Sequence, residues 1–158
     1  MLCKVDNREK ASSQIIDNIR KSNQTPESSI PKIEDINLDD WELECDKKGD
    51  VIGQANLYSN KGDWYSCTVQ KVFVHPSHRN KGIANKLVSK IIEKARNRKD
   101  NGLPDCQILT ADIDRSNVPS RTVFEKAGFK IKDSFCVPGE NTKADVLRMS
   151  LTGIRNCK

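Results

Sequence analysis

The sequence of 158 residues predicts a single α+β domain over 1–158, and three patterns support this fold class. Residues 72–74 favour a strand that Pro76 ends, and from Gly82 onward apolar residues recur at helical spacing. A predicted hairpin turns at 46–50, and a second strand, turn and helix follow at 106–127. Hairpins combined with strand-to-helix units are typical of a sheet that has helices packed on it.

The first half of the chain is predicted to begin with a helix and continue with strands. The helix over 8–21 carries isoleucines at 15, 16 and 19 on its inner side, and the Ser, Asn, Gln and Pro residues of 22–31 indicate a loop. The predicted elements are, in order, a short strand at 2–5, helices at 8–21 and 32–37, and strands at 41–45, 51–58 and 65–74.

The second half is predicted to contain two helices and three strands. The helix from Gly82 is amphipathic, with Ile83, Leu87, Val88, Ile91, Ile92 and Ala95 on its apolar side. Strands are expected at 106–113, 129–137 and 144–151, with a helix at 118–127 after the first of them. Asn117 suits the start of that helix, and Gly128 suits the left-handed residue after its end.

The turn that joins residues 72–74 to the following helix is a candidate phosphate site. The first turn of a helix presents unpaired backbone N–H groups and the positive end of the helix dipole. Arg79 and Lys81 add positive charge at the same place. The turn has neither G-x-G-x-x-G nor G-x-x-x-x-G-K-[ST], so it matches neither the dinucleotide fingerprint nor the ATP-type loop. A diphosphate is the anion expected there.

Two segments together resemble the GNAT N-acetyltransferase superfamily over residues 41–151. Arg79, Gly82 and Ala84 match its acyl-CoA loop, [RQ]-x-x-G-x-[GA]. The form N-x-x-[AS]-x-x-[LVF]-Y-x-K-x-G-F is matched by Asn117, Ser120, Val123, Phe124, Lys126, Gly128 and Phe129. The resemblance implies a mixed, mostly antiparallel sheet with helices on both faces. It also implies acetyl transfer from acetyl-CoA, without a metal, to an amine acceptor, and it leaves a homodimer open.

The resemblance implies a set of cofactor contacts. The pantetheine arm would pair with the backbone of Val72 and Val74, and the Val74 N–H would stabilise the thioester oxyanion. Ser120 is the candidate side chain for donating a proton to the leaving thiolate, and Tyr65 and Cys136 are alternatives. Acetyl-CoA would be held by Val72, Phe73, Val74, Arg79, Asn80, Lys81, Gly82, Ile83, Ala84, Asn117, Arg121 and Phe124.

Two positions depart from the usual family pattern. Phe124 stands where relatives commonly carry a Tyr that protonates the leaving thiolate, and Phe has no proton to give. The strand at 65–74 has no Glu that could act as a base. Its Cys67, Thr68, Gln70 and Lys71 are not convincing bases at neutral pH. The general acid and the general base are therefore not assigned from the sequence.

The composition argues against a membrane-spanning protein, a zinc- or disulfide-containing protein and a nucleic-acid-binding protein. No apolar run approaches the roughly 20 residues that cross a bilayer, and the N-terminus has no signal-peptide core, so a cytoplasmic protein is expected. The six cysteines are dispersed without C-x-x-C, which argues against zinc and disulfides and for mostly reduced thiols. Few aromatic residues interleave with the basic ones, so nucleic acid is not an expected partner.

The net charge of +5 is unevenly distributed along the chain. Basic residues dominate 71–99, where Glu93 is the one acid, and acidic residues dominate 27–46, where Lys32 is the one base. For most of these residues a solvated surface is the ordinary explanation. The functional alternative is that the basic part receives CoA while the acidic part borders a pocket for a cationic acceptor.

Three hypotheses about function follow. The first is an acetyl-CoA-dependent N-acetyltransferase that acts on a primary amine of a small molecule or a protein. The second is a catalytically weak CoA-binding regulatory module, which the Phe124 departure keeps open. The third is a basic interaction domain that has no role for CoA. Binding of acetyl-CoA and formation of an acetylated amine distinguish the three.

Overall fold

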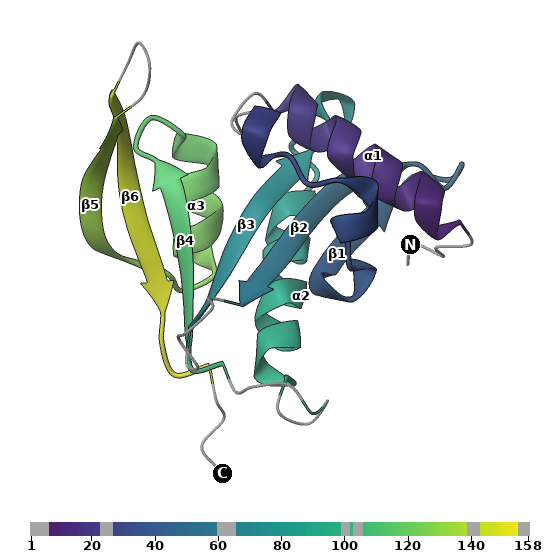
Figure 1. Ribbon diagram of the computed structural model, residues 1–158. Helices are drawn as coiled ribbons and strands as arrows, with labels where there is room; N and C mark the ends of the chain where they lie inside the picture. The colour runs from purple at the N-terminus through teal and green to yellow at the C-terminus, as the bar shows by residue number, and fades with distance from the viewer. Residues whose placement is uncertain are drawn as a thin grey trace. The chain divides into compact units, whose positions relative to one another are not determined.

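The computed structural model describes residues 7–22, 27–59, 66–98, 102, 106–138 and 143–154. The strand predicted at 2–5 lies outside these residues. The elements, shown in Figure 1, are α1 (Arg8–Lys21), η1 (Glu27–Ser29), η2 (Ile33–Asp35), η3 (Leu38–Asp40), β1 (Trp41–Cys45), β2 (Val51–Ser59), β3 (Ser66–Val74), η4 (Pro76–His78), α2 (Ile83–Arg96), β4 (Ile108–Asp114), α3 (Val118–Lys126), β5 (Lys130–Pro138) and β6 (Lys143–Leu151).

The six strands form a mixed sheet. Hydrogen bonds join them in the order β1-β2-β3-β4-β6-β5. The pairs β1–β2, β4–β6 and β5–β6 are antiparallel, whereas β3 and β4 are parallel. A mixed, mostly antiparallel sheet flanked by three helices confirms the predicted α+β fold class.

The chain divides into two compact units, which we describe one at a time. The first comprises Met1–Asn56 and Lys71–Leu87, and the second comprises Leu57–Gln70 and Val88–Lys158. The prediction of one domain over 1–158 stays a prediction.

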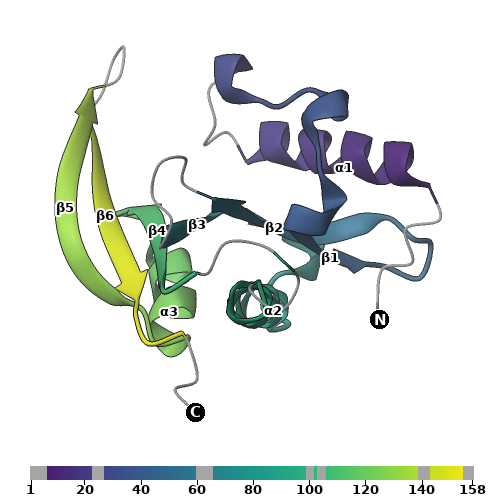
Figure 2. The ribbon, with the colours of Figure 1, turned by 60° about the horizontal axis from the view of Figure 1, so that its bottom comes forward.

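In the first unit, α1 packs on one face of the β1–β2 hairpin, as the view in Figure 2 shows. Ile15, Ile19 and Trp41 form a buried cluster, against which Ile30, Ile36, Leu38 and Leu43 pack. A buried polar connection lies beside it, because Asn18 Nδ2 donates to Gln54 Oε1 (3.1 Å) and Gln54 Nε2 donates to the Ile15 carbonyl (3.3 Å). These bonds satisfy the amide groups that folding removes from water.

The opposite face of β2 approaches the start of α2 at Gly53. A Cβ placed on Gly53 would lie 2.9 Å from Ile83 Cγ2 and 3.1 Å from Leu87 Cδ1. Real side-chain contacts are not this short, so the glycine permits the close approach. Lys86, in the first turn of α2, forms an ion pair with the buried Glu44 of β1 (Nζ to Oε2, 3.1 Å). Gly53 and Glu44 therefore fix the position of the start of α2 relative to β1 and β2.

In the second unit, β4 lies between β3 and β6. Residues 66–68 of β3 pair with 108–110 of β4, and β4 pairs with β6 along nearly its whole length. The inward side chains of β4 and β6 are fully or almost fully buried, as for Leu109, Ala111, Leu147 and Met149. Phe124 of α3 packs edge to face against Phe129, with ring centroids 5.0 Å apart. This packing attaches α3 to the chain that leads into β5.

The long helices and strands lie close to their predicted ranges, and the segment after α1 differs from the prediction. One cysteine also differs from the expected redox state. The helix predicted at 32–37 is the shorter 3-10 turn η2, flanked by η1 and η3. Cys45 is disulfide-bonded and is therefore an exception to the expectation of mostly reduced thiols. Cys67, Cys106 and Cys136 form no disulfide, as expected.

Candidate functional site

The predicted phosphate turn has the backbone shape of an anion-binding loop. Asn80 and Gly82 are both left-handed, with φ of +62° and +75°. Asn is among the few residues that tolerate this region, and glycine has no steric cost there. Two left-handed residues so close together fold the backbone back before α2 begins at Ile83. Arg79, Asn80, Lys81 and Gly82 are all exposed.

The start of α2 leaves backbone donors available. Gly82 precedes the helix, and its carbonyl accepts the first helical bond, from the Lys86 N–H (3.1 Å). Because glycine has no side chain, it cannot cap the N–H groups of Ile83, Ala84 and Asn85, which have no acceptor one turn earlier. A Cβ on Gly82 would meet no atom within 4 Å. The turn thus presents open N–H groups beside open space.

Arg79 is held in place at the end of β3. Its Nε donates to the carbonyl of Val74 (3.1 Å), and the neighbouring His75 N–H donates to the Ile52 carbonyl (2.7 Å). The first bond holds the guanidinium at the edge of the turn, and the second fixes the backbone at His75. Positive charge and open N–H groups at one place are the usual composition of a diphosphate site.

The predicted pantetheine-binding residues belong to the last part of β3. Val72 and Val74 are partly exposed, whereas Phe73 is buried, so Phe73 offers its backbone alone to a ligand. Lys71, just before them, is left-handed with φ of +55°. A left-handed residue inside a strand is typical of a bulge, which changes the direction of neighbouring groups.

Lys71 is the functional candidate that the sequence did not reveal. Its side chain is partly buried, and within the described ranges its ammonium forms no ion pair. Burial disfavours the charged form, so the pKa of Lys71 lies below the ordinary value of a lysine. The sequence carries no local signal for this, because both the burial and the bulge depend on the folded sheet.

In the second unit, the start of α3 is capped by its own residues. Asn117 Oδ1 accepts the N–H of Ser120 (3.3 Å), as predicted for a helix cap. Ser120 is partly buried within this cap. The cap uses the Ser120 N–H and leaves its hydroxyl for other contacts.

Arg121 has an unsatisfied donor. Its Nη1 donates to the Arg115 carbonyl (3.4 Å), but its Nε is buried and has no partner among the described residues. A buried donor without an acceptor is costly in a folded protein, and an absent ligand is one common explanation. An anionic group of a bound cosubstrate fits this position by its chemistry.

Phe124 lies in the core of the second unit. Only 3% of it is exposed, and its ring packs against Phe129. The side chain therefore has a packing role in this structure. Its assignment as a cofactor contact stays a prediction.

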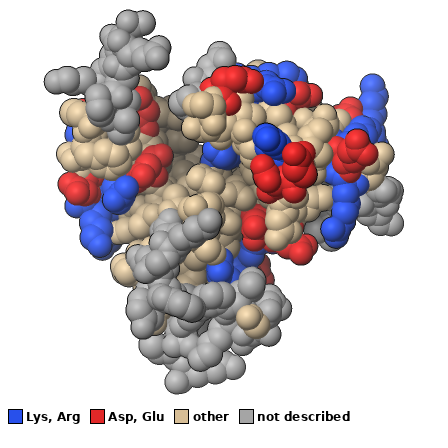
Figure 3. Space-filling view, in the orientation of Figure 1, with Lys and Arg blue, Asp and Glu red and all other residues tan. Residues whose placement is uncertain are grey.

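The charge segregation seen along the chain is reduced in the first unit, although Arg79 and Lys81 of the phosphate turn stay exposed. Basic and acidic groups pair there, as in Lys10 with Asp50, Arg20 with Glu27 and Lys86 with Glu44. Figure 3 shows red and blue atoms next to each other where α1 lies in Figure 1. Within the described residues there is no group of three or more His, Cys, Asp or Glu side chains suited to a metal, and no helix long and apolar enough to cross a membrane.

Comparison with known proteins points to one family. The model of the Acetyltransferase (GNAT) family matches residues 16–129. The L-amino acid N-acyltransferase MnaT of Escherichia coli is 33% identical over 97 residues, which are 56% of this chain and 49% of that protein. The chain therefore spans about half the length of this curated relative.

Solved structures share the fold. An acetyltransferase structure from Acinetobacter baylyi superposes with a TM-score of 0.77 at 15% identity, over 96% of this chain and 92% of that one. The yncA acetyltransferase of Salmonella typhimurium, solved with acetyl-CoA, gives a TM-score of 0.68 at 21% identity, over 92% and 90% of the two chains. At these identities the likeness concerns the fold alone.

Proposed function

Because the chain belongs to the GNAT acetyltransferase family, we propose that it transfers an acetyl group from acetyl-CoA directly to a primary amine of a small molecule or a protein. The observation that carries the proposal is the turn at 79–84. Its two left-handed residues, open N–H groups and fixed Arg79 form a cradle for a diphosphate. The family membership identifies CoA as the carrier of that diphosphate. The comparisons lend no support to the regulatory alternative.

The residues present fit acetyl-CoA. In the first unit, Arg79 and Lys81 offer charge, and the first N–H groups of α2 offer donors. In the second unit, taken by itself, the buried Arg121 Nε has no acceptor among the described residues, and its assignment to acetyl-CoA stays a proposal from the family resemblance. We propose that the backbone of Val72 and Val74 holds the pantetheine arm, with the Val74 N–H directed at the thioester oxygen.

The reaction needs three proton or charge adjustments. An acceptor ammonium has to lose a proton before its nitrogen can attack the thioester carbon. The carbonyl oxygen then becomes negative and requires a donor, for which we propose the Val74 N–H. When the C–S bond breaks, the CoA thiolate takes up a proton. Ser120 remains the proposed donor, because Phe124 has none.

We propose Lys71 as the group that accepts the acceptor's proton. It adjoins Val72, and burial lowers the pKa of its amine, which raises the fraction present as a neutral base. Replacing it by Met should lower kcat by about 10²-fold or more, the usual contribution of a general base. KM for acetyl-CoA should change little. Lys71→Arg, which keeps the charge but cannot act as a base, should be equally slow.

A stability measurement separates this role from a structural one. Removing a partly buried charge that has no ion-pair partner among the described residues should leave the free energy of unfolding unchanged or raise it. A Lys71→Met protein with normal kcat would refute the assignment. A Lys71→Met protein that urea unfolding shows to be markedly less stable would instead indicate a structural role for Lys71.

The direct test of the proposed function is Gly82→Glu. The new side chain puts bulk and negative charge into the turn, so acetyl-CoA binding and turnover should both be lost. Gly49→Glu is the matched control, because Gly49 is also exposed and left-handed (φ +84°) and also has open space around it. Binding is measured by calorimetry, and turnover by release of free CoA with a panel of amines that includes L-amino acids.

A second measurement covers the case in which Gly82→Glu fails to fold. Acetyl-CoA at 100 times its Kd should stabilise the unaltered protein by about 2.7 kcal/mol. The increase should become smaller in Lys81→Met, which lacks one charge of the turn. An unaltered protein that shows no stabilisation would indicate the interaction domain instead.

A further inference from the structure

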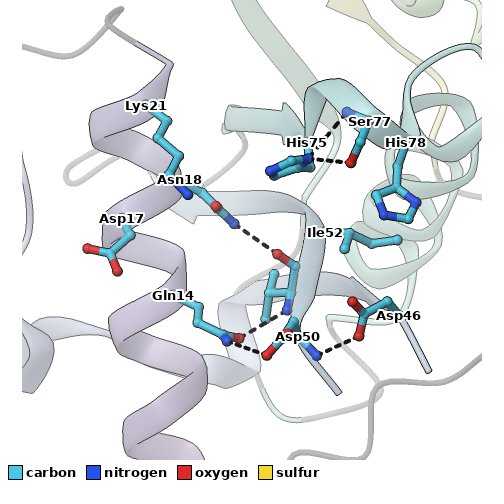
Figure 4. A pocket seen from close by; sticks show the side chains of 11 residues that line it. Gln14, Asp17, Asn18, Lys21, Asp46, Asp50, Ile52, His75, Ser77 and His78 are labelled. Carbon is cyan, nitrogen blue, oxygen red and sulfur yellow. Dashed lines mark hydrogen bonds between the residues drawn. The ribbon is translucent and has the colours of Figure 1, made fainter. Parts of the chain in front are cut away.

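A pocket in the first unit lies beside the phosphate turn and has no role in the proposed reaction. Its volume is about 400 Å³, which is within the ordinary size range of small-molecule sites. It is lined by α1, by the hairpin between β1 and β2, and by η4 (Figure 4). None of residues 71–74 or 79–84 lines it, so it is separate from the groups assigned to acetyl-CoA.

One wall of the pocket carries an acceptor without a partner, on a buried residue. Asn18 is 4% exposed, and its Nδ2 donates both to the Val51 carbonyl (3.2 Å) and to Gln54 Oε1 (3.1 Å). These two bonds set the orientation of the amide and leave Oδ1 on the pocket side. Among the described residues Oδ1 has no hydrogen-bond donor. Its chemistry calls for an N–H group of a ligand.

The facing wall carries a donor. His75 Nδ1 accepts the Ser77 N–H (3.3 Å) and lies 2.7 Å from Ser77 Oγ. In the neutral ring the proton is therefore on Nε2. Figure 4 shows the His75 ring turned toward α1, with Asn18 across from it and Lys21 on the same side. Lys21 is exposed and supplies a positive charge that forms no ion pair in the described residues.

The carboxylates of the pocket are partly engaged within the protein. Asp50 Oδ1 accepts from Gln14 Nε2 (2.8 Å), and Lys10 lies 3.3 Å from it. Asp46 Oδ1 accepts the N–H groups of Lys48 and Asp50. Asp17 is more open, since 59% of its side chain is exposed and Arg20 approaches only to 3.8 Å. The lining therefore offers acceptors for an ammonium and, at Lys21 and His75, donors for a carboxylate.

We propose that this pocket is a binding site for a small zwitterion that carries an ammonium and a carboxylate, as a free α-amino acid does. Asn18 Oδ1 receives the ammonium, and Lys21 and His75 Nε2 receive the carboxylate. A simple cation would leave Lys21 and His75 unused, and a simple anion would be repelled by the three carboxylates. The proposal does not depend on acetyl-CoA binding, since it concerns a different set of residues.

The chain offers a direct probe of this site. Its only two histidines are His75 and His78, and both line the pocket. Nitrogen-15 labelling of histidine therefore gives ring signals that come from this site alone. Three unlabelled probes are compared. L-alanine carries an ammonium and a carboxylate, ethylamine carries the ammonium alone, and propionate carries the carboxylate alone. They are titrated without acetyl-CoA at a fixed pH of about 7.5, above the ordinary pKa of histidine.

L-alanine should shift the ring signals of both histidines in a saturable way. Ethylamine and propionate should bind about tenfold more weakly or worse, because each lacks one charged contact. Lys21→Met should weaken L-alanine binding by about two- to fivefold, the value of one exposed charge contact. Lys32→Met is the control, because Lys32 is an exposed lysine of the same unit that does not line the pocket.

Two results would overturn the proposal. One is the absence of saturable shifts with L-alanine, and the other is equal binding of L-alanine and either single-charge probe. The Gly82→Glu protein should retain the L-alanine shifts, although it should not bind acetyl-CoA. A folded Gly82→Glu protein without these shifts would show that the pocket belongs to the CoA site, which would refute a separate zwitterion site.

Discussion

The starts of α2 and α3 follow the same plan and differ in one physical respect. Each helix follows a strand and a short turn, and each begins after a residue with a strong positional preference. Before α3 this residue is Asn117, whose side chain accepts an N–H of its own helix. Before α2 it is Gly82, which has no side chain. At the start of α3 a side chain of the protein accepts a backbone N–H, whereas at the start of α2 no side chain of the preceding residue can do so.

The difference shows how one local motif can serve stability or binding. A side-chain cap contributes about 1 kcal/mol to a helix because it replaces water at an orphan N–H. Without it, the N–H groups of α2 keep that bonding capacity for an external anion. The open start still has to be positioned, and its position comes from packing against Gly53 and from the ion pair of Lys86 with Glu44. Changes at the two helix starts should therefore have different consequences.

The largest effect is expected at Gly53. In Gly53→Ala the new methyl group would meet Ile83 and Leu87 at 2.9 and 3.1 Å, so β2 and the start of α2 must move apart. Such overpacking costs about 1–3 kcal/mol of unfolding free energy. Since Ile83 belongs to the phosphate turn, KM for acetyl-CoA should rise as well. Urea unfolding and steady-state kinetics measure the two effects.

Gly49→Ala is the matched control for this prediction. A methyl group on Gly49 would have no atom within 4 Å, but the φ of +84° at this position strains any L-residue. The variant should lose about 1 kcal/mol of stability without a change in KM for acetyl-CoA. A Gly53→Ala protein with an unchanged KM would mean that the position of α2 does not control the turn.

Features that depend on residues close together in the sequence were predictable. Features that depend on contacts within the folded sheet were not. The helix at Arg8–Lys21 and the strand at Trp41–Cys45 were predicted with their observed bounds, because apolar spacing and turn residues are read within one segment. The Asn117 cap and the left-handed Gly128 after α3 also follow from local chemistry.

Other features depend on contacts between distant segments. The left-handed conformation of Lys71 and its burial arise inside a paired strand. The pocket at Asn18 exists because Val51 and Gln54, which lie 33 and 36 residues further along the chain, orient its amide. The predicted helix at 32–37 is replaced by the 3-10 turn η2, and Ile36, just after it, packs against the cluster of Ile15, Ile19 and Trp41. Tertiary packing outweighs local propensity in such short segments.

A smaller effect is expected at Asn117, and it should concern stability first. Asn117→Ala removes the acceptor for the Ser120 N–H and should cost about 1 kcal/mol. Asn117→Asp keeps an oxygen at that place and should retain most of the stability. Thermal unfolding of the two variants without acetyl-CoA tests this. Equal losses in both would show that Asn117 contributes something other than a cap.

The smallest effect is expected in the pH dependence of the Glu44–Lys86 pair, which anchors the open helix start. Burial alone would raise the pKa of the Glu44 carboxyl, but the hydrogen bond and charge of Lys86 are among the causes that lower it, and on balance this pKa lies below its ordinary value of 4.5. The folded state therefore holds the proton less tightly than the unfolded chain. The resulting stability is present above pH 4.5 and is lost as the pH falls through the folded-state pKa.

Glu44→Gln should thus be less stable than the unaltered protein by about 1 kcal/mol at pH 7, and the difference should shrink as the pH falls below about 4.5. Urea unfolding at a series of pH values measures the difference, with Glu34→Gln as the control at an exposed glutamate. If the difference stays constant down to about pH 3, then the carboxyl contributes through packing and not through its charge.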